Sequence, residues 1–299
     1  MGNFNEVLSE LQKAGHAVDI LRREYIKKLA AVTDSNVIIY YSGWLQKPQM
    51  HGKVHGFDVN DADKNGFMSA IHGMDRSKGL DLVLHTPGGD IAATESLVDY
   101  LRAMFSHIRV IVPQLSMSAG TMIAFASDEV VMGKHSSLGP IDPQVGGLPA
   151  HGVVEEFRTA IAEVTANPLS AHIWQPIVGK YSPTFVGECQ KIIQWADDMT
   201  KGWLATGMFK NDPDPQGKAA VVVHEFGDHA LTLAHNRHMP LAKVRAAGVV
   251  VMALEDDDHL QEAVLTLHHA AILTLMTTPA IKIIENQLDT AHIISAMES

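Results

Sequence analysis

A serine and two glycines occupy two small-residue turns whose chemistry is complementary. Gly88 and Gly89 follow Pro87 in a Thr-Pro-Gly-Gly turn, and Ser118 lies in Ser-Met-Ser-Ala-Gly-Thr, 29 residues after Gly89. A hydroxyl at one turn and unpaired backbone amides at the other are the ingredients of nucleophilic acyl transfer with an oxyanion hole. The two turns together predict a catalytic centre with Ser118 as its nucleophile.

Each turn ends a predicted strand and opens a predicted helix. The strands cover 81–85 and 108–113, and the carboxyl ends of neighbouring parallel strands meet at one edge of a sheet. We therefore expect the two turns to be adjacent in space. The first N–H groups of a helix have no partner within it, so the amides of Gly88, Gly89 and Ala119 are the expected oxyanion donors. The alternative is that both are ordinary tight turns of an α/β protein.

The elements that must position these turns alternate along the chain. Short apolar runs bounded by Gly, Pro or charge indicate buried strands, and apolar residues at helical spacing indicate helices. This alternation predicts an α/β protein with a largely parallel sheet flanked by helices. The predicted strands are 36–41, 81–85, 108–113 and 129–132, and the main predicted helices are 5–32, 60–74, 91–106, 119–127, 183–209 and 259–277.

Three segments are expected in the organisation of the 299-residue chain. Residues 1–34 form an N-terminal helix, and 35–210 hold the catalytic core. Residues 211–299 form a mostly helical C-terminal extension that oligomerises or borders the site, with one short strand at 249–252.

Composition narrows the class of protein. A net charge of −11 argues against a nucleic-acid partner, and the basic run at 21–28 is predicted to be a solvated helix face. No apolar run reaches the length of a membrane span, so no integral membrane segment is expected. A single cysteine, Cys189, excludes an internal disulfide and fits a reducing compartment. With no secretory signal visible, we expect a cytoplasmic protein.

Four motifs carry a resemblance to a known family. They are His85-Thr-Pro-Gly-Gly-Asp, Ser118-Ala-Gly-Thr, Ala126-Ser-Asp-Glu-Val-Val-Met and Leu138-Gly-Pro-Ile-Asp-Pro-Gln. Together they resemble the serine dehydrogenase proteinase family, which belongs to the superfamily of the Clp protease proteolytic subunit, signal peptide peptidase A and crotonase. The resemblance covers about 35–210.

This resemblance implies a Clp/crotonase-like layered parallel sheet and a serine peptidase that forms an acyl-enzyme on Ser118. It also implies an oxyanion hole made by the Gly89 and Ala119 amides, a peptide or protein substrate, and a homo-oligomer. No Gly-x-Gly-x-x-Gly motif is present to bind a dinucleotide, and no cofactor is expected.

The general base is less clearly marked than the nucleophile. Asp142 stands where the Clp protease subunit carries its histidine, which argues against a Ser-His-Asp triad. Other branches of the superfamily use a Ser-Lys dyad, and a buried lysine can act as a base because desolvation lowers its pKa. Lys191, among apolar residues of the 183–209 helix, is the expected base, with Lys180 and His135 in reserve.

A histidine-rich stretch from His224 to His238 invites a metal interpretation. Its His-Glu-x-x-x-His spacing is one residue too long for the helical metalloprotease motif. Structural histidines are therefore favoured, and no metal is expected.

Three other functions stay open from the sequence. A crotonase-like acyl-CoA hydratase or hydrolase shares the two-amide oxyanion hole without a serine nucleophile. An α/β-hydrolase is considered because Ser116-Met-Ser-Ala-Gly is one residue from the Gly-x-Ser-x-Gly elbow. The chain is an inactive scaffold if no base reaches Ser118.

Overall fold

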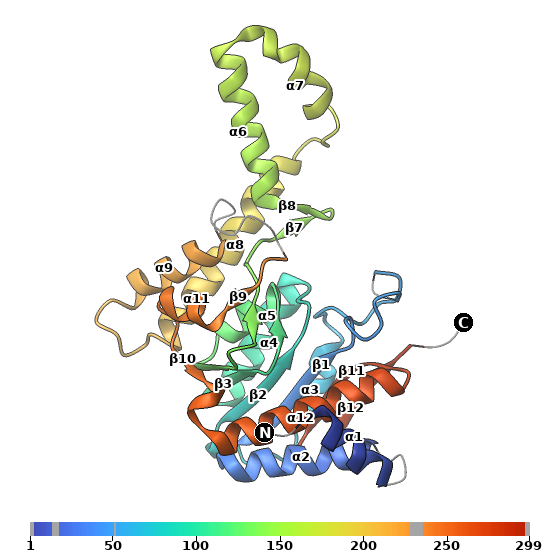
Figure 1. Ribbon diagram of the computed structural model, residues 1–299. Helices are drawn as coiled ribbons and strands as arrows, with labels where there is room; N and C mark the ends of the chain where they lie inside the picture. Colours follow the sequence, from blue (N-terminus) through green and yellow to red (C-terminus); the bar gives the residue numbers. More distant parts are fainter. Residues whose placement is uncertain (1–2, 14–17, 51, 228–235, 297–299) are drawn as a thin grey trace.

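A seven-stranded sheet forms the centre of the protein in a computed structural model that describes residues 3–13, 18–50, 52–227 and 236–296 (Figure 1). The strand order is β10-β5-β3-β2-β1-β11-β12. The five strands from β10 to β1 are parallel, and β11 and β12 continue the sheet antiparallel. The bounds are Asn36–Ser42 (β1), Leu80–His85 (β2), Ile108–Val112 (β3), Glu129–Met132 (β5), Val251–Ala253 (β10), Ala280–Asn286 (β11) and Ala291–Ser295 (β12).

Helices cover both faces of this sheet because its central strands are buried on both sides. In β2, Leu82 and Leu84 belong to one hydrophobic core and Val83 to the other, as side chains alternate along a strand. The first core is closed by α3 (Asp63–Ile71), α4 (Ile91–Met104), α5 (Ala119–Phe125), α8 (Phe185–Thr206) and α9 (Pro215–Gly227). The second is closed by α1 (Phe4–Lys13), α2 (Val18–Thr33) and α12 (Asp258–Thr277). The predicted α/β architecture is confirmed.

A helical arm projects from this layered body (Figure 1). It consists of α6 (Ala150–Ala166), the turn η2 (Pro168–Ser170) and α7 (Ala171–Val178), and the chain returns to the body through α8. A small cluster of Ala150, Val153, Val154 and Cys189 packs at its base.

Short elements connect the larger ones. A three-stranded sheet joins β4 (Leu115–Ser116), β6 (Ser137–Leu138) and β9 (Met239–Pro240), and β7 (Gln144–Val145) pairs with β8 (Leu148–Pro149). The remaining elements are η1 (Arg76–Lys78), α11 (Leu241–Ala246) and η3 (Leu254–Asp256). No helix in the described ranges is long and apolar enough to cross a membrane.

The C-terminal region contributes more to the sheet than its sequence predicts. Its helices α9, α11 and α12 are present, and the strand expected at 249–252 is β10. The strands β11 and β12 were not expected, yet β11 lies inside the sheet, where it pairs with β1 on one side and β12 on the other. Its sequence hides this position because Lys282 and Glu285 interrupt the apolar run, although both are fully buried.

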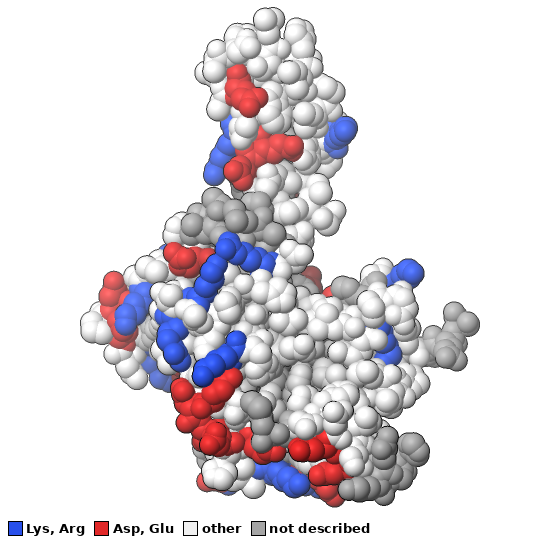
Figure 2. Space-filling view, in the orientation of Figure 1, with Lys and Arg blue, Asp and Glu red and all other residues white. Residues whose placement is uncertain are grey.

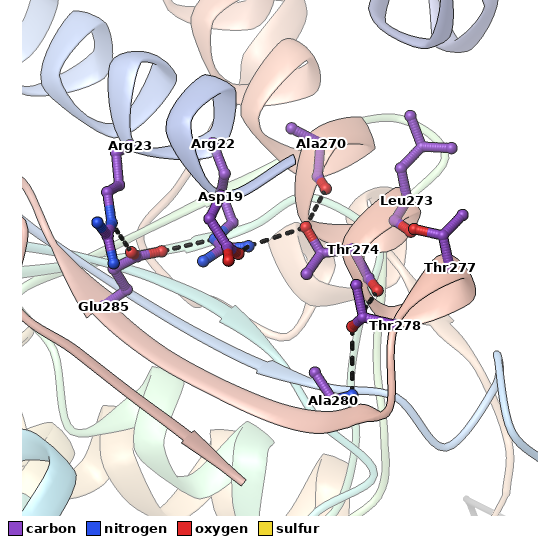
Figure 3. A network of polar contacts seen from close by, with 10 residues as sticks. All are labelled: Asp19, Arg22, Arg23, Ala270, Leu273, Thr274, Thr277, Thr278, Ala280 and Glu285. Carbon is purple, nitrogen blue, oxygen red and sulfur yellow. Dashed lines mark hydrogen bonds and ion pairs between the residues drawn. The ribbon is translucent and has the colours of Figure 1, made fainter. Parts of the chain in front are cut away.

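A buried ion-pair network fastens β11 to the helices on one face (Figure 3). The Arg22 Nε donates to Glu285 Oε2 at 2.5 Å, and its Nη1 donates to Asp19 and to the Thr274 hydroxyl. Arg23 donates to the other Glu285 oxygen at 2.8 Å. The prediction that the basic run 21–28 forms a solvated face is thus wrong for Arg22, which is fully buried.

Replacing Arg22 by methionine leaves Glu285 in the core with Arg23 as its remaining partner. We expect the free energy of unfolding to fall, by less than the about 3–5 kcal/mol of a buried charge left without any partner, because Arg23 still compensates Glu285. Urea unfolding monitored by circular dichroism measures this. The double variant Arg22→Met/Glu285→Gln removes both charges and should recover part of the loss; no recovery would contradict the electrostatic explanation.

Candidate active site

The two turns singled out in the sequence are hydrogen-bonded neighbours. The Thr86 N–H donates to the Leu115 carbonyl at 3.2 Å, and the Met117 N–H donates to the Thr86 carbonyl at 3.0 Å. Thr86 and Ser116 thus form a parallel bridge beyond the ends of β2 and β3. The predicted adjacency of the turns follows from this pairing.

Gly88 packs directly against the turn that contains Ser118. A Cβ atom at Gly88 would lie 2.6 Å from the Met117 carbonyl oxygen and 2.8 Å from the Ser118 Cβ. Gly88 also has φ +100°, which L side chains rarely adopt. Only glycine allows this close approach of the two backbones.

Ser118 has an unusual backbone conformation at the start of α5. Its φ is 51° and its ψ is −117°, and its hydroxyl makes no capping bond to the helix. A non-glycine residue with positive φ is held there at a cost, and such residues concentrate at functional sites. The conformation leaves the hydroxyl at the head of the helix, where backbone amides and the helix dipole favour negative charge.

Two of the three expected donor amides are available. The Gly88 N–H is already bonded to the Thr86 hydroxyl at 3.2 Å. Within the described ranges, neither the Gly89 nor the Ala119 N–H donates a hydrogen bond. The free amides that border Ser118 are therefore those of Gly89 and Ala119, and the Gly88 amide is engaged in holding its own turn.

Thr121 connects the Ser118 turn to the segment that contains Gly139. Its buried hydroxyl lies 3.0 Å from the Ser116 carbonyl oxygen and 2.9 Å from that of Gly139, and it accepts a bond from the Gly139 N–H. A Cβ on Gly139 would lie 3.0 Å from the Ser118 N. The segment after β6 thus packs against the serine turn on its second side.

A pocket of about 160 Å³ opens beside Ser118. Its walls come from the start of α4, from α5, from the segment after β6 and from α8. The lining residues are Gly89–Ala92, Ser118, Met122, Ile141–Gln144, Ile192 and Trp195. The walls combine apolar side chains with the polar residues Asp90, Asp142 and Gln144, and Ser118 and Gly89 lie in the same lining. A concave site of this mixed kind can hold a small acyl group next to a nucleophile.

The candidate bases lie outside this lining. Lys191 precedes Ile192 on α8, and its side chain is exposed, so the expected partial burial is absent in the single chain. Lys180 is exposed at the end of the arm, and a His135 ring nitrogen lies 2.9 Å from the Pro113 carbonyl oxygen. The buried Asp142, in contrast, lines the pocket.

The histidine-rich stretch falls partly outside the described residues, which exclude 228–235. His224 is exposed on α9. Among the described residues, no group of three or more His, Cys, Asp or Glu side chains is arranged to hold a metal ion.

His85 lies on the face of β2 opposite to Leu84, in an aromatic environment. Its ring centroid is 4.4 Å from that of Trp44, 5.5 Å from Tyr41 and 5.7 Å from His268. Burial lowers the pKa of His85 to about 3, partly opposed by the nearby Leu115 carbonyl. His85 therefore stays neutral and packs beneath the turn that begins with Thr86.

Three residues that line or support the site were not predicted from the sequence as site residues. Ile192 and Trp195 lie in the helix expected over 183–209, and apolar spacing along a helix does not distinguish a core position from a pocket wall. Val59, whose backbone pairs with the Gly88–Gly89 turn, lies in a loop and carries no motif.

Comparison with known families agrees with this geometry. A family model described as ClpP-like SDH-type serine proteinase matches residues 9–167, which is more than half of the chain. The chain belongs to this family. The suspected resemblance is thereby confirmed, and so is a serine proteinase assignment at the level of the family.

Two relatives from Methanocaldococcus jannaschii share parts of this sequence. The uncharacterized protein MJ0137 is 31% identical over 153 residues, which cover 46% of this chain and 54% of the relative. The uncharacterized protein MJ1495 is 37% identical over 95 residues, or 32% of each chain. The chain thus spans about half or less of these relatives' lengths.

Among solved structures, a serine-to-alanine mutant of the 1510-N membrane-bound stomatin-specific protease is similar at 16% identity with a TM-score of 0.40. The match covers 69% of this chain and 79% of that one.

Ser118→Gly and Ser118→Ala should differ in stability although both lack the hydroxyl. Glycine adopts a φ of 51° without strain, whereas alanine at this position has the same backbone strain as serine. We expect the glycine variant to be more stable by about 1 kcal/mol, after allowance for its more flexible unfolded chain. Thermal unfolding of the two variants measures the difference, and an alanine variant of equal or higher stability would contradict the strain.

His85 should make the protein sensitive to acid. Its pKa in the folded protein, about 3, lies below the unfolded value of 6.5, so from pH 6.5 down to 3 only the unfolded chain takes up the proton. Stability should fall with decreasing pH in that window by up to about 1.4 kcal/mol per pH unit from this group. Urea unfolding at pH 7, 6, 5 and 4 measures this. The free energy of unfolding should decline less steeply with falling pH in His85→Phe than in the wild-type protein, and equal slopes would show that His85 is not a source of the acid sensitivity.

Proposed function

We propose that this protein is a serine endopeptidase in which Ser118 is the nucleophile and the amides of Gly89 and Ala119 form the oxyanion hole. The observation that carries the proposal is the geometry of one small site. A positive-φ serine at a helix start faces a pocket, and the two free amides border the same turn. Family membership adds independent support.

The proposed reaction has two stages. The Ser118 Oγ attacks the carbonyl carbon of a peptide bond and gives up its proton, and the negative charge that develops on the carbonyl oxygen is stabilised by the two amides. The C–N bond then breaks, and the leaving amine takes the proton from the base. Water attacks the resulting ester in the second stage, which releases the acid and restores the hydroxyl.

We propose Lys191 as the base that accepts the Ser118 proton. Lys191 is next to Ile192 and one helical turn before Trp195. Both of these neighbours line the pocket, and Lys191 is exposed beside them. A lysine accepts a proton readily only when it is desolvated. Bound substrate or a neighbouring subunit must therefore cover the exposed side chain before it acts. By the sequence resemblance, Asp142 stands where the Clp protease subunit carries its histidine, which favours a lysine base in this proposal.

We further propose a peptide or protein substrate and a homo-oligomeric assembly in the cytoplasm. The arm supports the assembly, because it exposes Ile161, Leu169 and Ile173 at fractions of 68%, 72% and 68%. Figure 2 shows that the visible face of the arm carries only a few charged side chains. Exposed apolar surface of this kind favours association. The single cysteine fits a reducing compartment.

Labelling with a fluorophosphonate probe tests the proposed site. The wild-type protein should be labelled at Ser118, Ser118→Ala should not be labelled, and Lys191→Ala should react about 10²–10⁴ times more slowly because the general base is lost. Lys201→Ala, on the same helix, is the matched control and should react normally.

Three results would overturn this proposal. Equal labelling of all variants would remove both residues from the mechanism, and absence of labelling from all of them would indicate an unreactive serine. Turnover of an acyl-CoA thioester that survives Ser118→Ala would instead identify a crotonase-type enzyme.

A further inference from the structure

A buried ion pair connects β11 to the segment that runs beside the Gly88–Gly89 turn. Lys282 and Asp63 are both excluded from solvent. The Lys282 Nζ lies 2.7 and 2.9 Å from the two carboxylate oxygens of Asp63, and it also donates to the Asp58 carbonyl at 2.8 Å. The ammonium group therefore holds both ends of the segment 58–63.

Further bonds to Asp63 make this segment compact. The Tyr40 hydroxyl donates to Asp63 Oδ2 at 2.8 Å, and the Asn60 N–H donates to the same oxygen at 3.0 Å. Val59 lies between the two attachment points of Lys282 and is buried. Its backbone position is thus determined by polar contacts on either side of it.

Val59 in turn braces the glycine turn. Its N–H donates to the Gly88 carbonyl at 2.7 Å, and its carbonyl accepts the Asp90 N–H at 2.9 Å. A Cβ on Gly89 would lie 2.3 Å from both the N and the O of Val59. The Val59 backbone occupies the space in which any side chain at position 89 would have to lie.

The bond to Gly88 determines where the Gly89 N–H points. The Gly88 carbonyl and the Gly89 N–H belong to one planar trans peptide and point in opposite directions. When the Val59 N–H holds the carbonyl, the amide must face away from Val59. Rotation of this peptide unit would break the Val59 bond and turn the amide out of the site.

The cost of burying Lys282 makes a purely stabilising role a weak explanation. Burial lowers the pKa of Lys282, and Asp63 opposes that shift. Buried ion pairs often contribute little net stability relative to apolar residues of similar size. An apolar pair could not form the hydrogen bonds that the Lys282 ammonium group makes to the Asp58 carbonyl and the Asp63 carboxylate, on either side of Val59.

A second buried pair on the same strand provides a natural comparison. Glu285 lies three residues after Lys282, so its side chain points to the opposite face of the sheet. There it binds Arg22 and Arg23 of α2. This second pair is equally buried and belongs to the same strand, but its hydrogen bonds connect β11 to α2 and α12, away from the glycine turn.

We propose that Lys282 is a positioning residue for the oxyanion hole, which it serves by holding Asp58 and Asp63 so that Val59 fixes the Gly88–Gly89 peptide. The proposal rests on the proposed role of the Gly89 amide in catalysis. Lys282 touches no substrate and acts only through this chain of backbone contacts.

The test compares three variants with the wild-type protein. Lys282→Met removes the ammonium group, and Lys282→Met/Asp63→Asn also neutralises the carboxylate that would otherwise remain buried, so that folding is preserved. The matched control is Arg22→Met/Glu285→Gln. For each, the rate of fluorophosphonate labelling is measured against probe concentration, and hydrogen–deuterium exchange is followed in peptides that cover 86–92.

Both Lys282 variants should show a maximal labelling rate about 10- to 100-fold lower, which is within the effect of losing one oxyanion donor. The half-saturating probe concentration should be unchanged, because probe binding is not affected. Exchange in 86–92 should become faster. The control should keep the wild-type rate and the wild-type exchange in this segment, even where its stability is lower.

The outcomes separate this proposal from the function on which it rests. If the wild-type protein is labelled and the folded Lys282 double variant reacts at the same rate, the positioning role is wrong and the serine site stands. If Ser118 is not labelled in the wild-type protein, the proposed function fails. In that case hydrogen–deuterium exchange still tests whether Lys282 holds the turn. If residues 86–92 are as well protected in the Lys282 variants as in the control, the positioning role is wrong too.

Discussion

The pairing of Thr86 with Ser116 is the constraint on which the candidate site depends. Gly88 and Ser118 each lie two residues beyond this bridge, so the parallel pairing brings them side by side. The absence of a side chain at Gly88 lets the two backbones touch. A helix begins after each turn, so backbone amides there lack a partner within the helix. The free amides of Gly89 and Ala119 lie in the two turns that meet at Ser118. A slip of one residue in this pairing would turn the serine away from the glycine turn.

Two buried ion pairs connect β11 to elements on the two faces of the sheet. Glu285 binds α2, while Lys282 binds the segment before α3. Because a buried charge tolerates few positions for its partner, each pair specifies where a neighbouring element must lie. The C-terminal strands are thus part of the same folding unit as the serine turn. Residues 211–299 supply helices on both faces and also the strands β10, β11 and β12 at the two ends of the sheet.

Much of the core could be predicted from the sequence because its signals are local. The apolar runs at 81–85 and 108–113 became β2 and β3, and the turn glycines and Ser118 lie where their motifs indicated. The strand β11 could not be predicted in the same way. Lys282 and Glu285 are typical of exposed positions, and their partners, Asp63 and Arg22, are more than 200 residues away. Arg22 was assigned to a solvated face for the same reason.

The sequence by itself indicated the strands β1, β2, β3 and β5, the two turns and the serine at a helix start, since these depend on residues close together in the chain. Tertiary structure decided which amides are free, which side chains line the pocket and how far each candidate base lies from it. The helix α8 brings Ile192 and Trp195 to the pocket while Lys191 stays exposed. Such outcomes depend on contacts between distant segments, and no local pattern encodes them.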